Sequence, residues 1–514
     1  MHWSDEIVEG LVGRGGSHVI ATGTSISGIP HVGNASDVIR GDCVRKALAA
    51  SGQDAELIWI SDDSDPFRKV PAGMESLRDH LGFPVKDIPD PHGCHSNFVD
   101  HMAKPFLEDL EKFGVNPTVY SGTELYRTGA LLDEIRTSFK TRDKIREILN
   151  RFRSDPLPED YVPWTPVCDG CGRISTTNVT GIDGMNVSYE CVTTDVSGGE
   201  VEGCGFKGVS DASQGMGKLP WRVEWAARWH HFKVTCEPFG KEHAASGGSY
   251  DTSKIISQEV FGWQPPLPVV YEFFTLNGAK ISSSQGNVIT LSDWLEIAEP
   301  EVLKYFMYKR LQKQRDINLS SLTSLTDEYD TAERVYFCKE EGDAGFKEMY
   351  SLSQIGEPEY LNVPFTLCAV LAQIIPEDNE RMLSDRVSSM GYDGFSEKRL
   401  KERTRLAGTW VQKHGPEYLL FHLIDDGEAA KISDSLTEKQ LEALKKISQE
   451  LGKEWKPEDF HKRIYETSRN VGEDPKQVFE AIYLALIGKR KGPKAAMFLL
   501  TLDRDFVVRR LSTI

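Results

Sequence analysis

The chain has 514 residues, which is too long for a single hydrophobic core, so two to four domains are expected. No apolar run is long enough to cross a bilayer, and the first residues lack the pattern of a secretory leader, which argues against a membrane or secreted protein and predicts a cytoplasmic one. The formal net charge of −18 argues against general nucleic-acid binding, but residues 391–514 are mildly basic and suit local contact with RNA.

The first 100 residues alternate apolar strands with helical stretches, the pattern of a doubly wound parallel sheet. Residues 17–21 predict a buried strand, 22–25 a glycine-bearing turn, and 34–48 a helix. A strand, a loop and a helix N-terminus form an anion site, because free N–H groups and the helix dipole face the ligand. His31 at the helix entrance can donate to phosphate oxygens, and Gly33 leaves room for a nucleotide. Taken alone, His31 is better explained as an ordinary histidine at a helix start.

A helical insertion is predicted at about 105–155. Its apolar residues recur at helix-like spacing: Leu131, Ile135, Phe139, Ile145 and Ile148. The sheet is expected to resume near Pro220 and to end around Lys280.

Four cysteines form a metal-binding pattern between the insertion and the resumed sheet. Cys168 and Cys171 make a CxxC knuckle, and Cys191 and Cys204 supply two more thiols. Four thiolates match the closed tetrahedral shell of a structural Zn²⁺, with no position left for catalysis. Free buried thiols are the alternative. The other five cysteines lack such spacing and are interpreted as core or loop residues.

A second polar loop follows an apolar, aromatic strand at 269–274. Asn277 and Gly278 predict a turn, and Lys280 comes directly after it, followed by serines at 282–284. A lysine on a serine-rich loop suits a group that closes over a triphosphate and then releases pyrophosphate. A solvated polar loop is the alternative. Together with the segment around His31, this loop predicts an ATP site that forms adenylates.

Residues 286–340 are expected to be a helical connector, and the chain beyond it to be all-helical. Thr437 and Gln440 form a capping box, and the residues after it place one apolar face on a helix: Leu441, Leu444, Ile447 and Leu451.

The two polar segments resemble the HIGH and KMSKS signatures of class I aminoacyl-tRNA synthetases. The variants Pro30-His31-Val32-Gly33-Asn34 and Lys280-Ile281-Ser282-Ser283-Ser284-Gln285-Gly286-Asn287 resemble those of class I, archaeal-type lysyl-tRNA synthetases. Further stretches that support this family are 61–71, 90–94, 221–225, 240–243 and 488–495. The chain departs from the family at Gln285, where a lysine is usual, which leaves Lys280 as the loop's cation.

The resemblance implies an α/β fold: a Rossmann-type, doubly wound catalytic domain with a zinc-bearing insertion, followed by an all-α anticodon-binding α-helix cage. The expected segments are the first half of the catalytic domain at 1–104, the insertion at 105–212, the second half at 213–285, the connector, which would contact the tRNA stem, at 286–340, and the anticodon-binding domain at 341–514.

The resemblance also implies the reaction. L-lysine and ATP, with Mg²⁺, give lysyl-adenylate and pyrophosphate, and the lysyl group then moves to the 3′-terminal ribose of tRNA(Lys). No membrane and no obligate protein partner is expected. The residues expected to be catalytic are His31, Asn34, Lys280 and Ser283. Those expected to bind ATP are Gly23, Pro30, His31, Gly33, Asn34, Gly240, Glu242, Lys280, Ser282, Ser283 and Ser284, with Glu242 a candidate for the ribose hydroxyls.

A lysine pocket needs a deep carboxylate and aromatic walls, because burying an unpaired ammonium is costly. The expected lysine-binding residues are Gly23, Ser25, Asp37, Trp221, Glu224, His243 and Tyr271. Asp37 and Glu224 are the two candidate acids. A carboxylate that stabilises the helix dipole is the alternative for Asp37, and core packing is favoured for Trp225 and Trp229.

Two other functions remain open on the sequence alone. A class I synthetase for cysteine or glutamate would keep the ATP signatures and change the pocket. A nucleotidyltransferase or an RNA-binding zinc protein would lack tRNA charging. Lysine-dependent ATP–pyrophosphate exchange, measured with and without tRNA, separates these possibilities.

Overall fold

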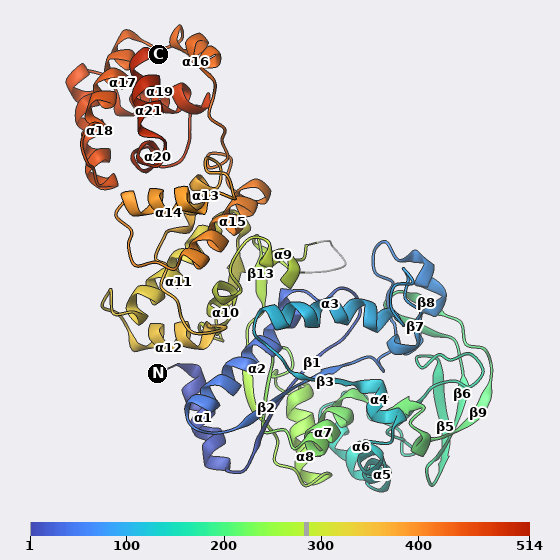
Figure 1. Cartoon of the computed structure of the whole chain (residues 1–514). Helices are drawn as coiled ribbons and strands as arrows, with labels where there is room; N and C mark the ends of the chain where they lie inside the picture. Colours follow the sequence, from blue (N-terminus) through green and yellow to red (C-terminus); the bar gives the residue numbers. More distant parts are fainter. Residues whose placement is uncertain (1, 282–286) are drawn as a thin grey trace. The chain divides into compact units, whose positions relative to one another are not determined.

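A computed structural model describes residues 2–281 and 287–514 (Figure 1). The chain divides into two compact units. The N-terminal unit comprises Met1–Asp293 and Leu303–Ile317, and the C-terminal unit comprises Trp294–Val302 and Asn318–Ile514. The boundaries of the five segments expected from the sequence stay predictions. Among the described residues, we find no helix with the length and apolarity that a bilayer crossing requires.

The N-terminal unit is built on a five-stranded parallel sheet with the order β12-β11-β1-β2-β3. Its strands are β1 (His18–Thr24), β2 (Ala55–Ser61), β3 (Thr118–Ser121), β11 (Cys236–Gly240) and β12 (Leu267–Tyr271). The predicted doubly wound sheet is therefore confirmed. Strand order reverses between β1 and β11, where Ile20 pairs with Cys236. In such sheets ligands bind outside the carboxyl ends of the strands at this reversal.

Helices cover this sheet (Figure 1). They are α1 (Trp3–Arg14), α2 (Val32–Ala50), α3 (Phe98–Lys112), α4 (Gly122–Arg127), α7 (Trp221–Phe232) and α8 (Ser249–Glu259). Helix α2 packs on β1, β2 and β11, so its first turn lies by the carboxyl end of β1. The stretch predicted as a helical insertion, about 105–155, is helical only in part. It contains β3, which is an edge strand of the main sheet, and its later part forms two helices, α5 (Leu132–Lys140) and α6 (Arg142–Asn150), separated at Thr141.

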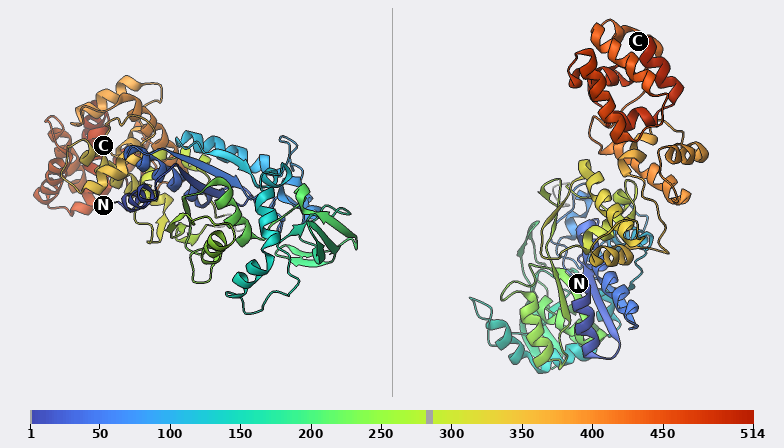
Figure 2. Two further views of the ribbon diagram at one scale, coloured as in Figure 1. Left: turned by 90° about the horizontal axis from the view of Figure 1, so that it is seen from below. Right: turned by 90° about the vertical axis from the view of Figure 1, so that its left-hand side faces the viewer.

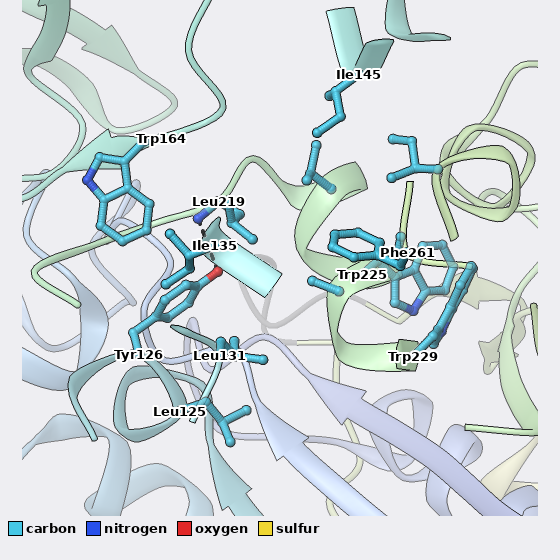
Figure 3. Packing of buried hydrophobic residues seen from close by; sticks show 14 of the residues in the cluster. Leu125, Tyr126, Leu131, Ile135, Ile145, Trp164, Leu219, Trp225, Trp229 and Phe261 are labelled. Atoms are coloured by element: carbon cyan, nitrogen blue, oxygen red, sulfur yellow. Dashed lines mark hydrogen bonds between the residues drawn. The ribbon is translucent and has the colours of Figure 1, made fainter. Parts of the chain in front are cut away.

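The apolar stripe predicted for the insertion enters the main core. All five of its residues are buried, in one cluster with Trp164, Leu219, Trp225 and Trp229. Figure 3 shows Leu131, Ile135 and Ile145 within this cluster. Antiparallel strands follow in the chain: β4 (Thr165–Pro166), β5 (Thr177–Asp183), β6 (Asn186–Cys191), β7 (Thr194–Val196), β8 (Gly199–Val201), β9 (Lys207–Asp211) and β10 (Gly217–Lys218).

The strand expected at 269–274 is interrupted. Strand β12 ends at Tyr271, and β13 (Phe274–Leu276) joins a separate small sheet with β14 (Ala279–Lys280) and β15 (Arg315–Ile317). The predicted turn is present, because Asn277 and Gly278 both have positive φ, 51° and 79°. The connector contains helices α9 (Leu291–Leu295), α10 (Pro300–Tyr308) and α11 (Leu322–Tyr336), but β15 is a strand, too short for a periodic signal.

Beyond residue 340 every described regular element is a helix, as predicted; Figure 2 shows this orange-to-red part as helices joined by loops. The helices are α12 (Ala344–Ser353), α13 (Phe365–Leu371), α14 (Glu380–Ser389), α15 (Glu397–Lys413), α16 (Asp426–Ser433), α17 (Glu438–Glu450), α18 (Pro457–Val471), α19 (Pro475–Ile487), α20 (Ala495–Thr501) and α21 (Arg504–Thr513). The capping box of α17 is confirmed: Gln440 N donates to Thr437 Oγ1 over 3.1 Å, and Thr437 N donates to Gln440 Oε1 over 2.9 Å.

Candidate functional site

A cavity of about 670 Å³ lies at the carboxyl ends of β1, β2 and β11. This is where the strand order reverses, the position at which open α/β sheets bind ligands. The structure brings several predicted site residues to its lining: Gly23, Ser25, Asn34, Asp37, Trp221 and His243. These residues come from two segments that are about 180 to 220 positions apart in the sequence, and the fold brings them into one pocket.

The first signature forms the N-terminus of α2. His31 is its N-cap, and the His31 Nδ1 atom accepts from the Gly33 N–H over 3.0 Å. The Asn34 Oδ1 atom accepts from the His31 N–H over 3.0 Å and completes a capping box. A Cβ on Gly33 would lie 2.7 Å from the imidazole Cε1, so glycine is needed here for the cap itself. The reading of His31 as a helix-start residue is thus confirmed, and its role toward ATP stays a prediction.

The cap also determines the protonation of the imidazole. Burial lowers the pKa of His31 below its usual value, so the ring is neutral at pH 7. Because Nδ1 accepts a hydrogen bond, the single ring proton resides on Nε2. His31 therefore presents one N–H donor in addition to its cap.

The second signature begins on an exposed hairpin. Lys280 is exposed at the end of β14, and the Asn287 side chain donates to the Lys280 carbonyl over 3.0 Å. Two residues further on, the Ile289 carbonyl accepts from the Val32 N–H in the first turn of α2 over 2.9 Å. The chain that follows the second signature is therefore bonded directly to the first. Ser282, Ser283, Ser284 and Gln285 lie outside the described residues.

Asp37 forms a buried group with two residues of different elements. The Tyr271 hydroxyl at the end of β12 donates to Asp37 Oδ1, and the Arg40 guanidinium lies 4.1 Å from the Tyr271 ring centroid. Burial raises the pKa of Asp37 to about 7, and the Tyr271 hydrogen bond and the Arg40 charge oppose this only in part. The alternative reading of Asp37 as a first-turn carboxylate is wrong, because the first turn of α2 contains no acidic residue.

Glu224, the second predicted acid, is already paired with two cations. It is fully buried, 2.9 Å from Lys218 Nζ and 2.9 Å from Arg228 Nη2. Lys218 also contacts Asp65, and Arg228 contacts Asp62 at 2.6 Å. Because both nearby cations neutralise Glu224, its pairing with a lysine substrate stays a prediction that this geometry does not favour.

Glu237 is an acid that the sequence reasoning missed. It lies on β11 and lines the cavity, where Trp225 Nε1 donates to it over 2.9 Å and Trp229 Nε1 over 2.5 Å. Burial raises the pKa of Glu237 to about 8, against the effect of both indole hydrogen bonds and with a contribution from Asp37. The only sequence signal was a carboxylate inside an otherwise apolar strand.

Aromatic rings form the walls around Glu237. Trp225 and Trp229 are 3% and 1% exposed, so their predicted core packing is confirmed; they lie together in Figure 3. Trp221 stacks on Trp225 with ring centroids 5.2 Å apart, and His243 meets Trp225 edge to face at 5.6 Å. The cavity thus combines the carboxyl groups of Asp37 and Glu237, both of raised pKa, with apolar walls, which suits a long cationic ligand.

The turn after β11 carries two predicted ATP-binding residues. Gly240 ends the strand, and a Cβ there would lie 2.5 Å from Glu242 Oε2. The exposed Glu242 carboxylate therefore folds back over Gly240 beside the strand end. Pro30 lies elsewhere, in a cavity of about 200 Å³ with Ile29, Leu291 and Ser292. The roles of Gly240, Glu242 and Pro30 stay predictions.

The four predicted cysteines converge into one cluster in the insertion. The Sγ atoms of Cys168 and Cys204 are 3.6 Å apart, and those of Cys171 and Cys191 are 3.7 Å apart. All four sulfurs lie within 4.8 Å of one another, so they could hold a metal ion. Zn–S bonds of about 2.3 Å would place tetrahedral sulfurs roughly 3.8 Å apart. The residues fit a closed four-sulfur site.

Comparisons with known proteins agree with this geometry. The family profile described as "tRNA synthetases class I (K)" matches residues 1–356, and one described as "Anticodon binding domain" matches residues 418–514. Proteins named "Lysine--tRNA ligase" are similar over nearly the whole chain. The protein of Methanosphaera stadtmanae is 37% identical over 99% of this chain and 98% of its own. Those of Methanocaldococcus jannaschii and Archaeoglobus fulgidus are 37% and 35% identical, over 100% and 99% of this chain and 99% of their own. The chain therefore belongs to the family of class I lysyl-tRNA synthetases.

Proposed function

We propose that this chain is a lysine–tRNA ligase that uses L-lysine, ATP and tRNA(Lys). One observation carries the proposal beyond family membership: Asp37 and Glu237 line the cavity beside the first signature, between aromatic walls. The two other carboxyl groups of the lining, Asp62 and Asp65, are already paired with Arg228 and Lys218. Lysine has two ammonium groups joined by an aliphatic stem, and this cavity offers a carboxyl group for each. A glutamate substrate would bring a further carboxylate to the same place.

In the first step a lysine carboxylate oxygen attacks the α-phosphorus of ATP, and the bond to the bridging oxygen breaks, so that pyrophosphate leaves. We propose that three groups stabilise the negative charge on the phosphates: His31 Nε2–H, the free N–H groups of α2 and the Lys280 ammonium. Asn34 acts by holding His31 in its cap. Mg²⁺, bound with ATP, neutralises further phosphate charge. The serines at 282–284 are proposed to close over the same phosphates.

Nucleoside binding is assigned to the strand ends. Gly23 on β1 and Gly240 on β11 lack side chains where the adenosine would approach the backbone. We assign Glu242, which folds over Gly240, to accept hydrogen bonds from the ribose hydroxyls. Gly23 and Ser25 also border the amino-acid cavity, so one loop serves both substrates.

In the second step a 3′-terminal ribose hydroxyl of tRNA attacks the lysyl carbonyl, and AMP leaves. Residues 418–514 match the anticodon-binding profile and are proposed to bind the anticodon. A cytoplasmic location is proposed because translation takes place there.

The direct test of this function is ATP–pyrophosphate exchange with purified full-length protein. We expect exchange with lysine and none with glutamate or cysteine. Transfer of radiolabelled lysine to tRNA(Lys) then reports the second step. Exchange with glutamate or cysteine in place of lysine would contradict the proposal.

Substituting His31 by asparagine should separate capping from catalysis. Asparagine is a good N-cap residue and can accept from the Gly33 N–H, but it lacks the imidazole Nε2–H. We expect His31→Asn to lower the exchange rate by about ten- to a thousandfold while the unfolding temperature stays close to wild type. His31→Ala should in addition lose about 1 kcal/mol of stability with the cap. Normal exchange in His31→Asn would show that the imidazole takes no part in the reaction.

Zn²⁺ is the metal we propose for the four-cysteine cluster. Cys168→Ser should contain one zinc fewer per chain than the wild type and should unfold at a lower temperature, because bound metal contributes folding free energy. Cys338→Ser is the control, since Cys338 is an exposed cysteine outside the cluster. Elemental analysis of protein prepared without chelators measures the zinc content of both variants. A wild type that contains no zinc would refute the site.

Ending the chain at residue 416 should uncouple the two steps. Of the removed helices, α17–α21 form most of one hydrophobic cluster, whereas both ATP signatures remain. We expect tRNA lysylation to fall by roughly tenfold or more, the effect of losing about 1.4 kcal/mol of binding, with exchange retained. Unchanged lysylation would show that this region does not read the anticodon.

A further inference from the structure

A cationic segment without counterions lies between α10 and β15. In a chain whose formal net charge is −18, residues 309–315 contain no acidic residue and four basic ones, Lys309, Arg310, Lys313 and Arg315. Arg310 and Lys313 are exposed. Among the residues that the structure describes, no carboxylate forms an ion pair with Arg310, Lys313 or Arg315. No step of the proposed reaction uses these side chains.

The fold brings these cations close to one another. Burial and the charges of Arg315 and Lys313 lower the pKa of Lys309 to about 8. Burial and the charge of Arg40, a fully buried residue of α2, lower the pKa of Arg315 to about 10. Like charges held at close range are unfavourable unless an anion compensates them. The segment therefore favours a negatively charged ligand.

The two arginines also have unused hydrogen-bond donors. Within residues 2–281 and 287–514, Nε and Nη1 of Arg315 and Nε and Nη2 of Arg40 are buried without a hydrogen-bond partner. Both guanidinium groups lie on aromatic rings instead. Arg40 is 5.1 Å from the Phe274 centroid, and Arg315 is 4.8 Å from that of Phe306. A ring face holds a cation in place without neutralising it, so the positive charge remains uncompensated.

The segment is fixed beside the second signature. Strand β13 pairs with β15 on one side and with β14 on the other, so Asp316 and Lys280 both pair with Thr275. Neighbouring strands lie about 4.8 Å apart, which places the backbones of Asp316 and Lys280 roughly 10 Å apart. The Leu311 carbonyl accepts from the Glu272 N–H over 2.8 Å, which ties the segment to the end of β12. The cations are therefore held next to the loop that carries Lys280.

We propose that residues 309–315 bind the phosphodiester backbone of tRNA in its acceptor arm, the arm that ends in the 3′-terminal ribose. A polyanion matches cations spread along an exposed segment, and the exposed Gln312 and Gln314 can bond to phosphate and 2′-hydroxyl oxygens. RNA this close to Lys280 belongs to the arm whose ribose must reach the lysyl group. The proposal rests on the proposed lysine–tRNA ligase function.

The C-terminus of α10 explains the cations only in part. Lys309 and Arg310 follow its last residue, Tyr308, and cations there stabilise the helix dipole. Lys313 and Arg315 lie beyond this effect, which falls off within the last turn. A role in the dipole alone predicts that removing Arg310 changes stability, whereas an RNA contact predicts that it changes tRNA binding.

Arg310→Gln combined with Lys313→Gln tests the contact in the full-length protein. Binding of tRNA(Lys) should weaken by about tenfold, and the slope of log Kd against log salt should fall by about 0.7–0.9 for each lost phosphate contact. ATP–pyrophosphate exchange without tRNA should stay at the wild-type level. Lys104→Gln combined with Lys140→Gln is the matched control, because both are exposed lysines of the same N-terminal unit, and it should bind tRNA normally.

Two further measurements distinguish the contact from other effects. Arg310→Lys combined with Lys313→Arg keeps both charges and should keep most of the affinity. Hydroxyl-radical footprinting should show backbone protection in the acceptor arm that the glutamine variant loses; protection lost only in the anticodon arm would overturn the proposal.

Unchanged tRNA affinity and salt slope in the glutamine variant would also overturn the proposal. So would a raised KM for ATP with normal tRNA binding, which would assign the cations to the nucleotide. A wild type that binds tRNA(Lys) but does not lysylate it would contradict the ligase function instead, and the binding comparison would still decide the contact.

Discussion

Replacing Lys280 by alanine is expected to lower lysine-dependent ATP–pyrophosphate exchange by about ten- to a thousandfold, with a much smaller change in lysine affinity. Lys280 is exposed at the end of a hairpin whose continuation is bonded to the first turn of α2, at Val32. Asn287, which donates to the Lys280 carbonyl, belongs to the same segment as Ile289, so the Lys280 backbone is linked to the α2 N-terminus, where the phosphates are proposed to bind. Because Gln285 is uncharged, we expect Lys280 to be the cation that this loop offers to the phosphates.

Two further variants make the Lys280 result specific. Lys280→Arg keeps the charge and should retain part of the activity. Lys207→Ala removes an exposed lysine of the insertion, on β9, and should exchange normally. Single-turnover adenylate formation at saturating lysine and ATP separates the chemical step from binding. Near-normal exchange in Lys280→Ala would mean that this loop is assigned wrongly.

The parts of the fold that sequence predicted well are those set by local patterns. The strand around Ile20 is an apolar run, and the stripe from Leu131 to Ile148 recurs at helical spacing, so the burial of both follows from the local sequence pattern. The sequence did not predict the places where a regular element is interrupted, because only a few residues determine each of them. The break after Tyr271 and strand β15 each involve only a few positions, and their pairing depends on partners about 40 residues apart.

The same distinction applies to the site. Signature loops and the CxxC knuckle are local, so His31, Lys280 and Cys168 were found from spacing. Glu237 was missed because its significance depends on two indoles from another element, and the i,i+4 spacing of Trp225 and Trp229 indicated only core packing. Trp225 and Trp229 have both roles, since their indoles are buried in the core and also donate to Glu237.

Lysine selection should depend on Glu237 and Asp37. We expect Glu237→Gln and Asp37→Asn each to weaken lysine binding by about a hundred- to a thousandfold, the cost of leaving a buried ammonium without its carboxylate. ATP binding should change little. Glu237, held between indoles, is assigned to the ε-ammonium, and Asp37, beside Tyr271, to the α-ammonium. The wild type should therefore reject norleucine and methionine by about a thousandfold or more, and Glu237→Gln should lose most of this discrimination.

The pH dependence of binding provides an independent check. The pKa values of Asp37 and Glu237, about 7 and about 8, mean that both carboxyl groups are partly protonated near neutral pH, and each must ionise to pair with an ammonium. Lysine affinity should therefore rise as pH increases from 6 to 8 and then level off, with proton release measurable by calorimetry in buffers of different ionisation enthalpy. Glu237→Gln should release fewer protons. Glu224→Gln is the comparison, because Glu224 is already paired with Lys218 and Arg228. If Glu224→Gln alone abolished lysine binding while the other two variants bound normally, the substrate's cation would lie against Glu224, and our placement of lysine would be wrong.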